Sequence, residues 1–364
     1  MTINAAFNSG IIDTAVNGAV NYADAQNKEQ ITFDDLDKDI QDIVKQIEDY
    51  NIGGGLGEDS TKDWDKTKVN PVESADNVVV PVPKGFVASK ATGENTVKDG
   101  FVIYQGTEDV TDANKDTAMT TRNQFVWVPV PDPSKMFTTH EGKDVGRLYN
   151  FNKSTKSYTE IAWNDAGYRE PDVVTGSDGT KYDAVASNYS SAGITEITNA
   201  NQFKTQLETA FAEMKTSVEK YHGFYIGRYE TGAVSTVKAV TVKGNLDIVN
   251  QTWYKYYQIS KDIVNTNGIK SSMIWESQWD QTLIWFHTQG EEKTENSYKK
   301  EYVYDSSRNG YYLASDRKVT ETGSSLTYAI NNIYDMAGNA YEWMLVTSSD
   351  NCRGLRGRGI WNFW

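Results

Sequence analysis

Few residues in this sequence could carry out acid–base or nucleophilic chemistry. The 364-residue chain has one cysteine, Cys352, and three histidines, His140, His222 and His287, which lie far apart. A cysteine nucleophile needs a base or a positive charge nearby to form the thiolate; Arg353 and Arg356 could lower its pKa, but no histidine lies near it in sequence. No two histidines have the spacing of metal ligands on one helix, and a single cysteine cannot form an internal disulfide or a cysteine-based zinc site. We therefore expect no catalytic residue, no metal site and no cofactor.

Three carboxylates remain as candidate bases or metal ligands: Glu230, Asp335 and Glu342. Each lies in a run of aromatic residues. Carboxylates in such a setting pair with buried arginines or with backbone amides more often than they catalyse. We favour that structural role, and with it a protein that is not an enzyme.

The composition limits the classes of partner. The formal net charge is −14 and the isoelectric point is about 4.8. Nucleic-acid binding needs a basic face, and the only basic cluster in the sequence is Arg353, Arg356 and Arg358. Aromatic residues make up 12% of the chain, enough for a core and for an amphipathic recognition surface. The sequence contains no apolar run long enough for a transmembrane helix.

Residues 1–52 have the pattern of two amphipathic helices. The second helix opens at Thr32, with Asp35 at the spacing of a capping box. Such helices must bury their apolar faces against each other, against a second copy of the chain or against the main domain. The segment is therefore either a helical stalk, which would oligomerise the chain through residues 1–50, or a packed hairpin. The glycine-rich and polar residues 53–77 are typical of a linker.

The remaining residues, 78–364, predict an α+β domain. Residues 131–193 have little periodicity and indicate an irregular insertion. Phe224–Glu230 is bulky at odd and even positions, as in a buried central strand. Regular elements are expected as strands at Val78–Pro83, Phe101–Tyr104, Phe125–Val130 and Val237–Val242, and as helices at Asn199–Lys220 and Met273–Phe286.

The C-terminal part divides into two segments. Tyr334–Trp343 contains a Gly338-Asn339 turn between aromatic residues and is typical of a rigid scaffold. The following segment is rich in Arg, Gly and Trp and has no period of 2 or 3.6 residues. An irregular segment of this composition, mounted on a rigid one, favours a binding surface.

Three stretches in this order resemble a known family. They are Phe224-Tyr-Ile-Gly-Arg-Tyr-Glu230, the helix around Trp279, and Tyr334-Asp-Met-Ala-Gly-Asn-Ala-Tyr-Glu-Trp343. Together they are similar to the formylglycine-generating-enzyme (sulfatase-modifying factor) type of C-type lectin fold. Arg356–Trp361 is a degenerate match to the Arg-Gly-Gly-x-Trp segment of that family, with Arg358 where glycine is usual. The resemblance implies a C-type-lectin-like domain preceded by a helical N-terminal segment.

Within that superfamily, the chain most resembles the variable proteins of diversity-generating retroelements. The resemblance implies a non-catalytic protein that displays a hypervariable C-terminal segment, here residues 350–364, to a protein or surface-glycan ligand. The scaffold would comprise Asp335, Gly338, Asn339, Glu342, Trp343, Arg356 and Gly357. The variable, ligand-binding positions would be Cys352, Leu355, Arg358, Gly359, Ile360, Trp361, Asn362, Phe363 and Trp364.

Two other functions stay open on the sequence. A formylglycine-generating-enzyme-like, metal-dependent oxidoreductase would need a cysteine pair for copper, or the clustered histidines of the iron-dependent relatives, and the chain has neither. A pilin-like or phage fibre subunit would use residues 1–50 to assemble. Asn8–Ala15 also resembles the stretch that follows a prepilin-type membrane helix, which implies a membrane tether before residue 1. We therefore expect a bacterial or prophage-encoded protein at the cell surface or outside the cell.

Overall fold

The computed structural model describes the chain from residue 61 onward, with gaps. The described ranges are 61–152, 157–161, 190–235, 238–245, 251–266, 268–288, 302–305, 310–313, 321–324, 329–336, 341–349 and 352–357. The chain divides into two compact units, Met1–Ile52 and Gly53–Trp364, and the described residues all belong to the second. The helical stalk or hairpin predicted for residues 1–52 lies outside the described residues.

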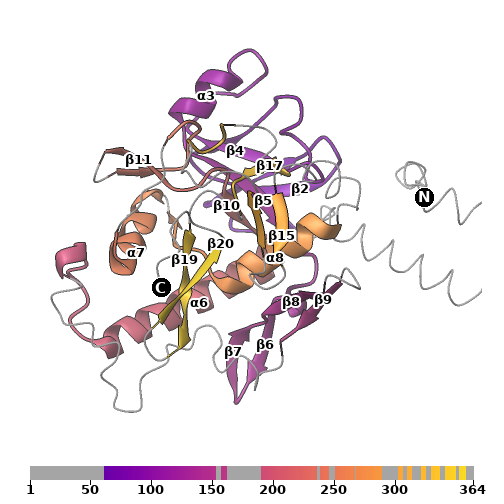
Figure 1. The fold of residues 1–364 in the computed structure, drawn as a ribbon. Helices are drawn as coiled ribbons and strands as arrows, with labels where there is room; N and C mark the ends of the chain where they lie inside the picture. The colour runs from indigo at the N-terminus through magenta and orange to yellow at the C-terminus, as the bar shows by residue number, and fades with distance from the viewer. Residues whose placement is uncertain are drawn as a thin grey trace, which may run out of the picture. The chain divides into compact units, whose positions relative to one another are not determined.

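The second unit is a mixed α+β structure built from several small antiparallel sheets and helices (Figure 1). Its largest described sheet has the strand order β10-β5-β4-β3. The strands are β3 (Phe86–Ala88), β4 (Val102–Gln105), β5 (Gln124–Pro129) and β10 (Gly223–Gly227). The β-branched and aromatic runs that predicted β4 and β5 thus do form strands.

Both faces of this sheet are buried, because successive side chains of a strand point to opposite faces. On β4, Val102 and Tyr104 join the main core, whereas Ile103 joins a second core with Trp127 of β5. The prediction that β10 is a central strand is wrong within the described sheet, where it pairs with β5 alone. Its bulk at odd and even positions reflects burial on two faces and not two neighbouring strands.

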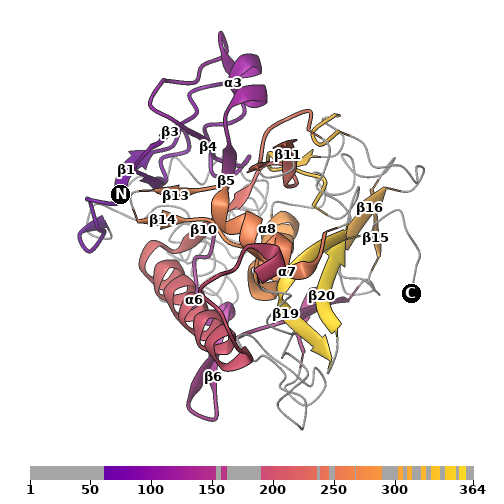
Figure 2. The same ribbon diagram turned by 90° about the vertical axis from the view of Figure 1, so that its left-hand side faces the viewer.

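Three helices pack around the main core. Helix α6 (Ala200–Tyr221) contacts β10, and α8 (Glu276–Thr288) contacts β5 (Figure 2). Helix α6 confirms the predicted 3.6-residue pattern: the Asn199 side chain caps its first turn, and His222 ends it in the left-handed conformation at φ 56°. Helix α7 (Trp253–Asp262), which follows the cap Thr252, was not predicted. The buried apolar face of α6 consists of Phe203, Leu207, Phe211 and Val218.

The second core corrects the linker prediction for residues 61–77, the described part of the predicted linker 53–77. Strand β1 (Val69–Glu73) pairs with β2 (Val79–Pro83) along its full length. Trp64 is 4% exposed, and its ring lies 5.6 Å from that of Tyr221 at the end of α6. The stretch is polar overall, but its few large apolar residues are buried, so residues 61–77 belong to the folded unit.

The irregular insertion predicted for residues 131–193 is also corrected in part. Two hairpins occupy its first half, and their four-residue strands are too short and too rich in polar residues to stand out in the sequence. They are β6 (Phe137–His140) with β7 (Lys143–Gly146), and β8 (Tyr149–Asn152) with β9 (Ser157–Glu160).

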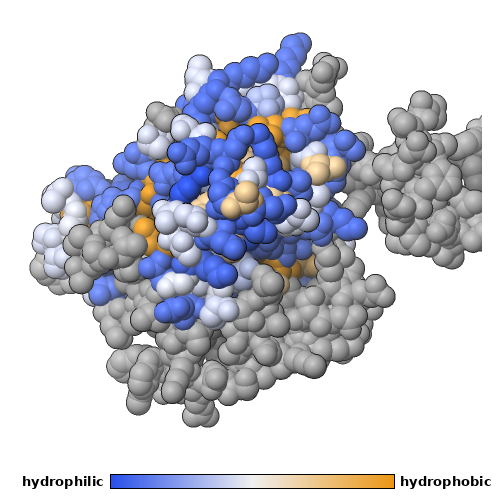
Figure 3. Space-filling model, turned by 90° about the horizontal axis from the view of Figure 1, so that it is seen from above, coloured by the Kyte–Doolittle hydropathy of each residue, from blue (hydrophilic) through white to orange (hydrophobic). Residues whose placement is uncertain are grey.

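Short elements complete the described structure. Around α3, the face seen from above is mostly hydrophilic, with small apolar areas between polar side chains (Figure 3). Within the described ranges, none of the helices has the length and hydrophobicity needed to cross a membrane. The short elements are α3 (Lys115–Thr121), the 3-10 helix η4 (Pro133–Lys135), β11 (Gly232–Ser235), β12 (Lys238–Val240), β13 (Asn265–Thr266), β14 (Ile269–Lys270), β15 (Tyr302–Asp305), β16 (Gly310–Leu313), β17 (Ala329–Ile330) and β18 (Ile333–Tyr334).

Candidate functional site

The predicted binding segment begins in a β-hairpin, named here the C-terminal hairpin. It consists of β19 (Tyr341–Ser349) and β20 (Cys352–Gly357). The composition of residues 351–364 predicts an irregular segment, and for β20 this prediction is wrong. A strand of Arg and Gly residues has no hydrophobic period to reveal it. Main-chain pairing with β19, interrupted by two register shifts, is what makes it a strand.

The strand pairing places a predicted variable residue, Leu355, opposite a predicted scaffold residue, Trp343. The scaffold residues Arg356 and Gly357 lie opposite Glu342 and Tyr341. The predicted variable residues lie elsewhere on the strand: Leu355 opposite Trp343, and Cys352 opposite Ser349. Trp343 is half-buried and packs against the main core, so Leu355 pairs with a residue that is itself anchored. Gly338 and Asn339, and the predicted variable residues 358–364, lie outside the described residues.

Strand β19 is fixed to the domain through its main chain. The Trp253 indole N–H donates a 2.9 Å hydrogen bond to the Met344 carbonyl oxygen, and the Leu345 N–H donates one of 3.0 Å to the Ile274 carbonyl oxygen. Met344 and Leu345 are buried in the main core. The C-terminal hairpin therefore packs on α7 and on Ile274, just before α8. Strand β20 lies on the far side of β19, next to β16 (Figure 2).

Asp335 lies at the start of the predicted scaffold and is 2% exposed. It has a left-handed backbone, with φ 60°. Its Oδ2 accepts hydrogen bonds from the Thr322 hydroxyl at 3.0 Å and from the Gly323 N–H at 3.1 Å. The sequence favours a structural role for this carboxylate, in which it pairs with buried arginines or backbone amides. The Gly323 N–H is such a backbone amide. Glu230 is buried as well, and Glu342 is half-buried in β19.

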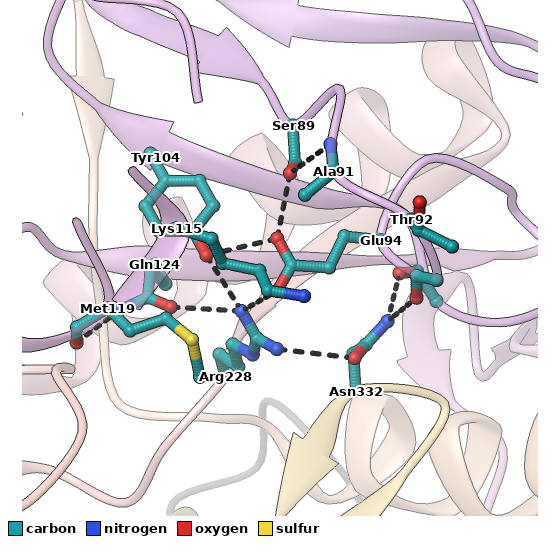
Figure 4. A network of polar contacts seen from close by, with 12 residues as sticks. Ser89, Ala91, Thr92, Glu94, Tyr104, Lys115, Met119, Gln124, Arg228 and Asn332 are labelled. Carbon is teal, nitrogen blue, oxygen red and sulfur yellow. Dashed lines mark hydrogen bonds and ion pairs between the residues drawn. The ribbon is translucent and has the colours of Figure 1, made fainter. Parts of the chain in front are cut away.

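Arg228 organises a polar network that the sequence analysis missed, named here the arginine network (Figure 4). Its Nη1 lies 2.8 Å from Glu94 Oε1 and donates to the Tyr104 hydroxyl at 2.9 Å and to Gln124 Oε1 at 3.0 Å. Its Nη2 donates to Asn332 Oδ1 at 3.3 Å. The side chains of Arg228 and Glu94 are each 3% exposed, so this ion pair is fully removed from water.

The electrostatics of the network favour a fixed charge state. Burial alone would lower the pKa of Arg228, but its interactions with Tyr229, Glu94 and Tyr104 outweigh burial and raise it. Burial raises the pKa of Tyr104 as well, against the effect of the Arg228 charge. Arg228 thus stays charged and Tyr104 stays protonated at neutral pH. The network thus joins a buried charged group to residues of several separate elements of the domain.

The sequence contained only a partial indication of this network. Arg228 lies in one of the three stretches that carry the family resemblance, but its partner Glu94 lies far upstream, in a loop with no recognisable motif. Tyr104 and Gln124 come from two adjacent strands, β4 and β5. Only the fold brings these positions together, so no local spacing could have identified them.

Among the residues that the structure describes, no three His, Cys, Asp or Glu side chains come together as a metal site. His140, His222 and His287 lie in β6, at the end of α6 and in α8, respectively. Comparison of the sequence with models of protein families, with curated proteins and with solved structures found no match.

Proposed function

We propose that this protein is a non-catalytic binding protein that presents the C-terminal segment, residues 350–364, to a ligand. One observation carries the proposal: the described anchors of the C-terminal hairpin include main-chain atoms of β19, the Met344 carbonyl and the Leu345 amide. A main-chain hydrogen bond does not depend on which side chains follow it. The adjoining strand β20 and the residues after it can then change without loss of these anchors.

The composition of the segment supports contact more than chemistry. Tryptophan and arginine are enriched at interface hot spots because they combine large contact area with directional polar groups. Residues 352–364 contain three arginines, two tryptophans and one phenylalanine. We propose a protein or a surface glycan as the ligand and, by resemblance, a C-type-lectin-like domain whose C-terminal segment is diversified by a retroelement. A cell-surface or extracellular location follows from that proposal.

The proposal is tested by binding of the full chain and of two matched variants to a glycan array and to intact bacterial cells. In the first variant, exposed residues of α6 are changed to alanine as a control. In the second, the C-terminal contact positions are changed to alanine. The control changes are Thr205, Thr209, Thr216 and Ser217, and the test changes are Arg358, Ile360, Trp361 and Phe363.

We expect the control variant to bind as the natural chain does, and the test variant to lose binding while keeping a cooperative melt. Equal binding by the two variants would contradict the proposal. A test variant whose melting temperature falls by several degrees would mark Trp361 or Phe363 as core, because truncating a buried large aromatic residue costs about 3–5 kcal/mol.

A further inference from the structure

The turn between β17 and β18 is a two-residue hairpin turn formed by Asn331 and Asn332. Both have left-handed backbones, with φ of 44° and 63°. Such a turn needs positive φ at both central positions, which asparagine tolerates better than most residues. The two asparagines therefore fit the backbone conformation of the turn. The Asn332 side chain in addition contacts other segments of the chain.

The Asn332 side chain joins three parts of the chain that are distant in sequence. Its amide nitrogen lies within hydrogen-bonding distance of three carbonyl oxygens, those of Gly93 at 2.7 Å, Asp99 at 3.1 Å and Gly100 at 2.8 Å. Its oxygen accepts from Arg228 Nη2. It thus uses its donor side and its acceptor side at once, linking the loop at residues 93–100 to the arginine network (Figure 4).

The turn is also held by close contact. A Cβ added to Gly100 would lie 1.9 Å from the Asn331 carbonyl oxygen, much less than a van der Waals contact. Gly100 itself has φ 97°, a conformation open to glycine. The loop and the turn therefore fit together with no space for a side chain between them.

The segment after the turn precedes the C-terminal hairpin in the sequence and is itself held in place. The Tyr334 N–H donates a 2.8 Å hydrogen bond to the Arg228 carbonyl oxygen, and the Tyr334 ring stacks on Tyr229 at 4.8 Å. Asp335 is then held by Thr322 and Gly323, and β19 begins at Tyr341. Residues 329–336 are thus fixed on the arginine network just before the strand that supports the proposed binding segment.

We propose that Asn332 is a positioning residue for the proposed binding segment. Its side chain fixes residues 329–336 on the buried Arg228–Glu94 pair, and these residues set the start of the C-terminal hairpin. This proposal rests on the proposed function, because Asn332 would order the segment that binds the ligand. From its place in the turn, Asn332 would control binding without touching the ligand.

Hydrogen exchange followed by mass spectrometry on the full chain tests the proposal without any ligand. Asn332→Gly removes the side-chain contacts and keeps a residue that accepts positive φ. Asn331→Gly is the matched control in the same turn, because the Asn331 side-chain nitrogen has no hydrogen-bond partner among the described residues. Peptides covering 329–336, 341–349 and 352–357 report on the hairpin, and peptides covering α6 report on the rest of the domain.

We expect Asn332→Gly to speed exchange in the hairpin peptides at least tenfold while α6 keeps its protection, and Asn331→Gly to stay within threefold of the natural chain throughout. Equal exchange of the hairpin peptides in the two variants would overturn the proposal. Loss of protection in α6 to the same degree, or a chain that does not fold, would also overturn it, because Asn332 would then be a general stabiliser. Failure of the proposed function would appear in the binding tests and would leave this exchange pattern unchanged.

Discussion

The arginine network and the C-terminal hairpin are fixed in different ways. In the network, the contacts are made by side chains: Arg228, Glu94, Tyr104 and Asn332 each depend on the chemical identity of the others. The known anchors of the hairpin include main-chain atoms of Met344 and Leu345. The first region is specified by its residue types. The second is specified by where the backbone runs, which is the property that the proposed variable segment would need.

The difference predicts opposite tolerance to substitution. A buried ion pair deprived of one partner leaves a charge without compensation, whereas a strand paired through its main chain accepts many side chains. Substitutions should therefore be costly around Arg228 and inexpensive in β20. The predictions below test each side of this contrast.

The largest effect is expected for Glu94→Ala. It leaves the Arg228 charge buried and unpaired, and should lower the free energy of unfolding by about 3–5 kcal/mol. Asp109→Ala is the control: it breaks the Lys90–Asp109 ion pair, whose side chains are more than 60% exposed, and should cost no more than about 1 kcal/mol. Urea denaturation of both variants measures the difference. Similar losses in the two would show that the network is not specified by its side chains.

A smaller loss is expected where the loop meets the turn. Gly100→Ala and Gly93→Ala both place alanine at positive φ, at a cost of about 1–3 kcal/mol each. The Cβ at position 100 would also collide with the Asn331 carbonyl, whereas the one at position 93 has nothing within 4 Å. Thermal melts should therefore show a larger fall for Gly100→Ala. An equal fall would mean that the loop moves aside freely.

His287 on α8 gives a pH-dependent contribution to stability. Burial lowers its pKa to about 4 from an ordinary value of 6.5. The unfolded chain thus binds a proton at this residue more readily than the folded chain does. Stability is complete above about pH 6.5 and is lost as the pH falls toward 4, by at most about 3 kcal/mol. His287→Gln should show a shallower loss between pH 7 and 4 in urea denaturation. Parallel pH profiles for the two proteins would refute this contribution.

The smallest effect concerns the anchor of β19. Trp253→Phe removes the indole N–H that donates to the Met344 carbonyl, a loss of about 1 kcal/mol. Trp279→Phe removes an equally buried indole whose N–H has no partner among the described residues. The difference between the two free energies of unfolding isolates the hydrogen bond. If Trp279→Phe costs as much or more, the anchor contributes little.

Elements with strong periodicity could be predicted from the sequence, and the candidate site could be predicted only in part. Helix α6 has an apolar face at 3.6-residue spacing and caps at both ends, so its bounds were nearly right. Helix α7 has polar residues at helical spacing, Lys255, Gln258 and Asp262, but it is only ten residues long and was not predicted. Strand β20 has no hydrophobic pattern in its sequence. Its pairing with the main chain of β19 makes it a strand. The Arg228–Glu94 pair depends on residues brought together by the whole domain, which one sequence cannot reveal.

We expect the C-terminal segment to tolerate substitutions that the arginine network does not. This expectation is tested most directly with two libraries displayed on yeast and sorted for resistance to protease. One library randomises seven of the nine predicted variable positions, 352, 355, 358–360 and 362–363, and the other randomises seven positions in and around the network: 89, 94, 104, 124, 228, 331 and 332. We predict that most members of the first library stay folded and that nearly all members of the second do not. Equal folded fractions in the two libraries would contradict the account.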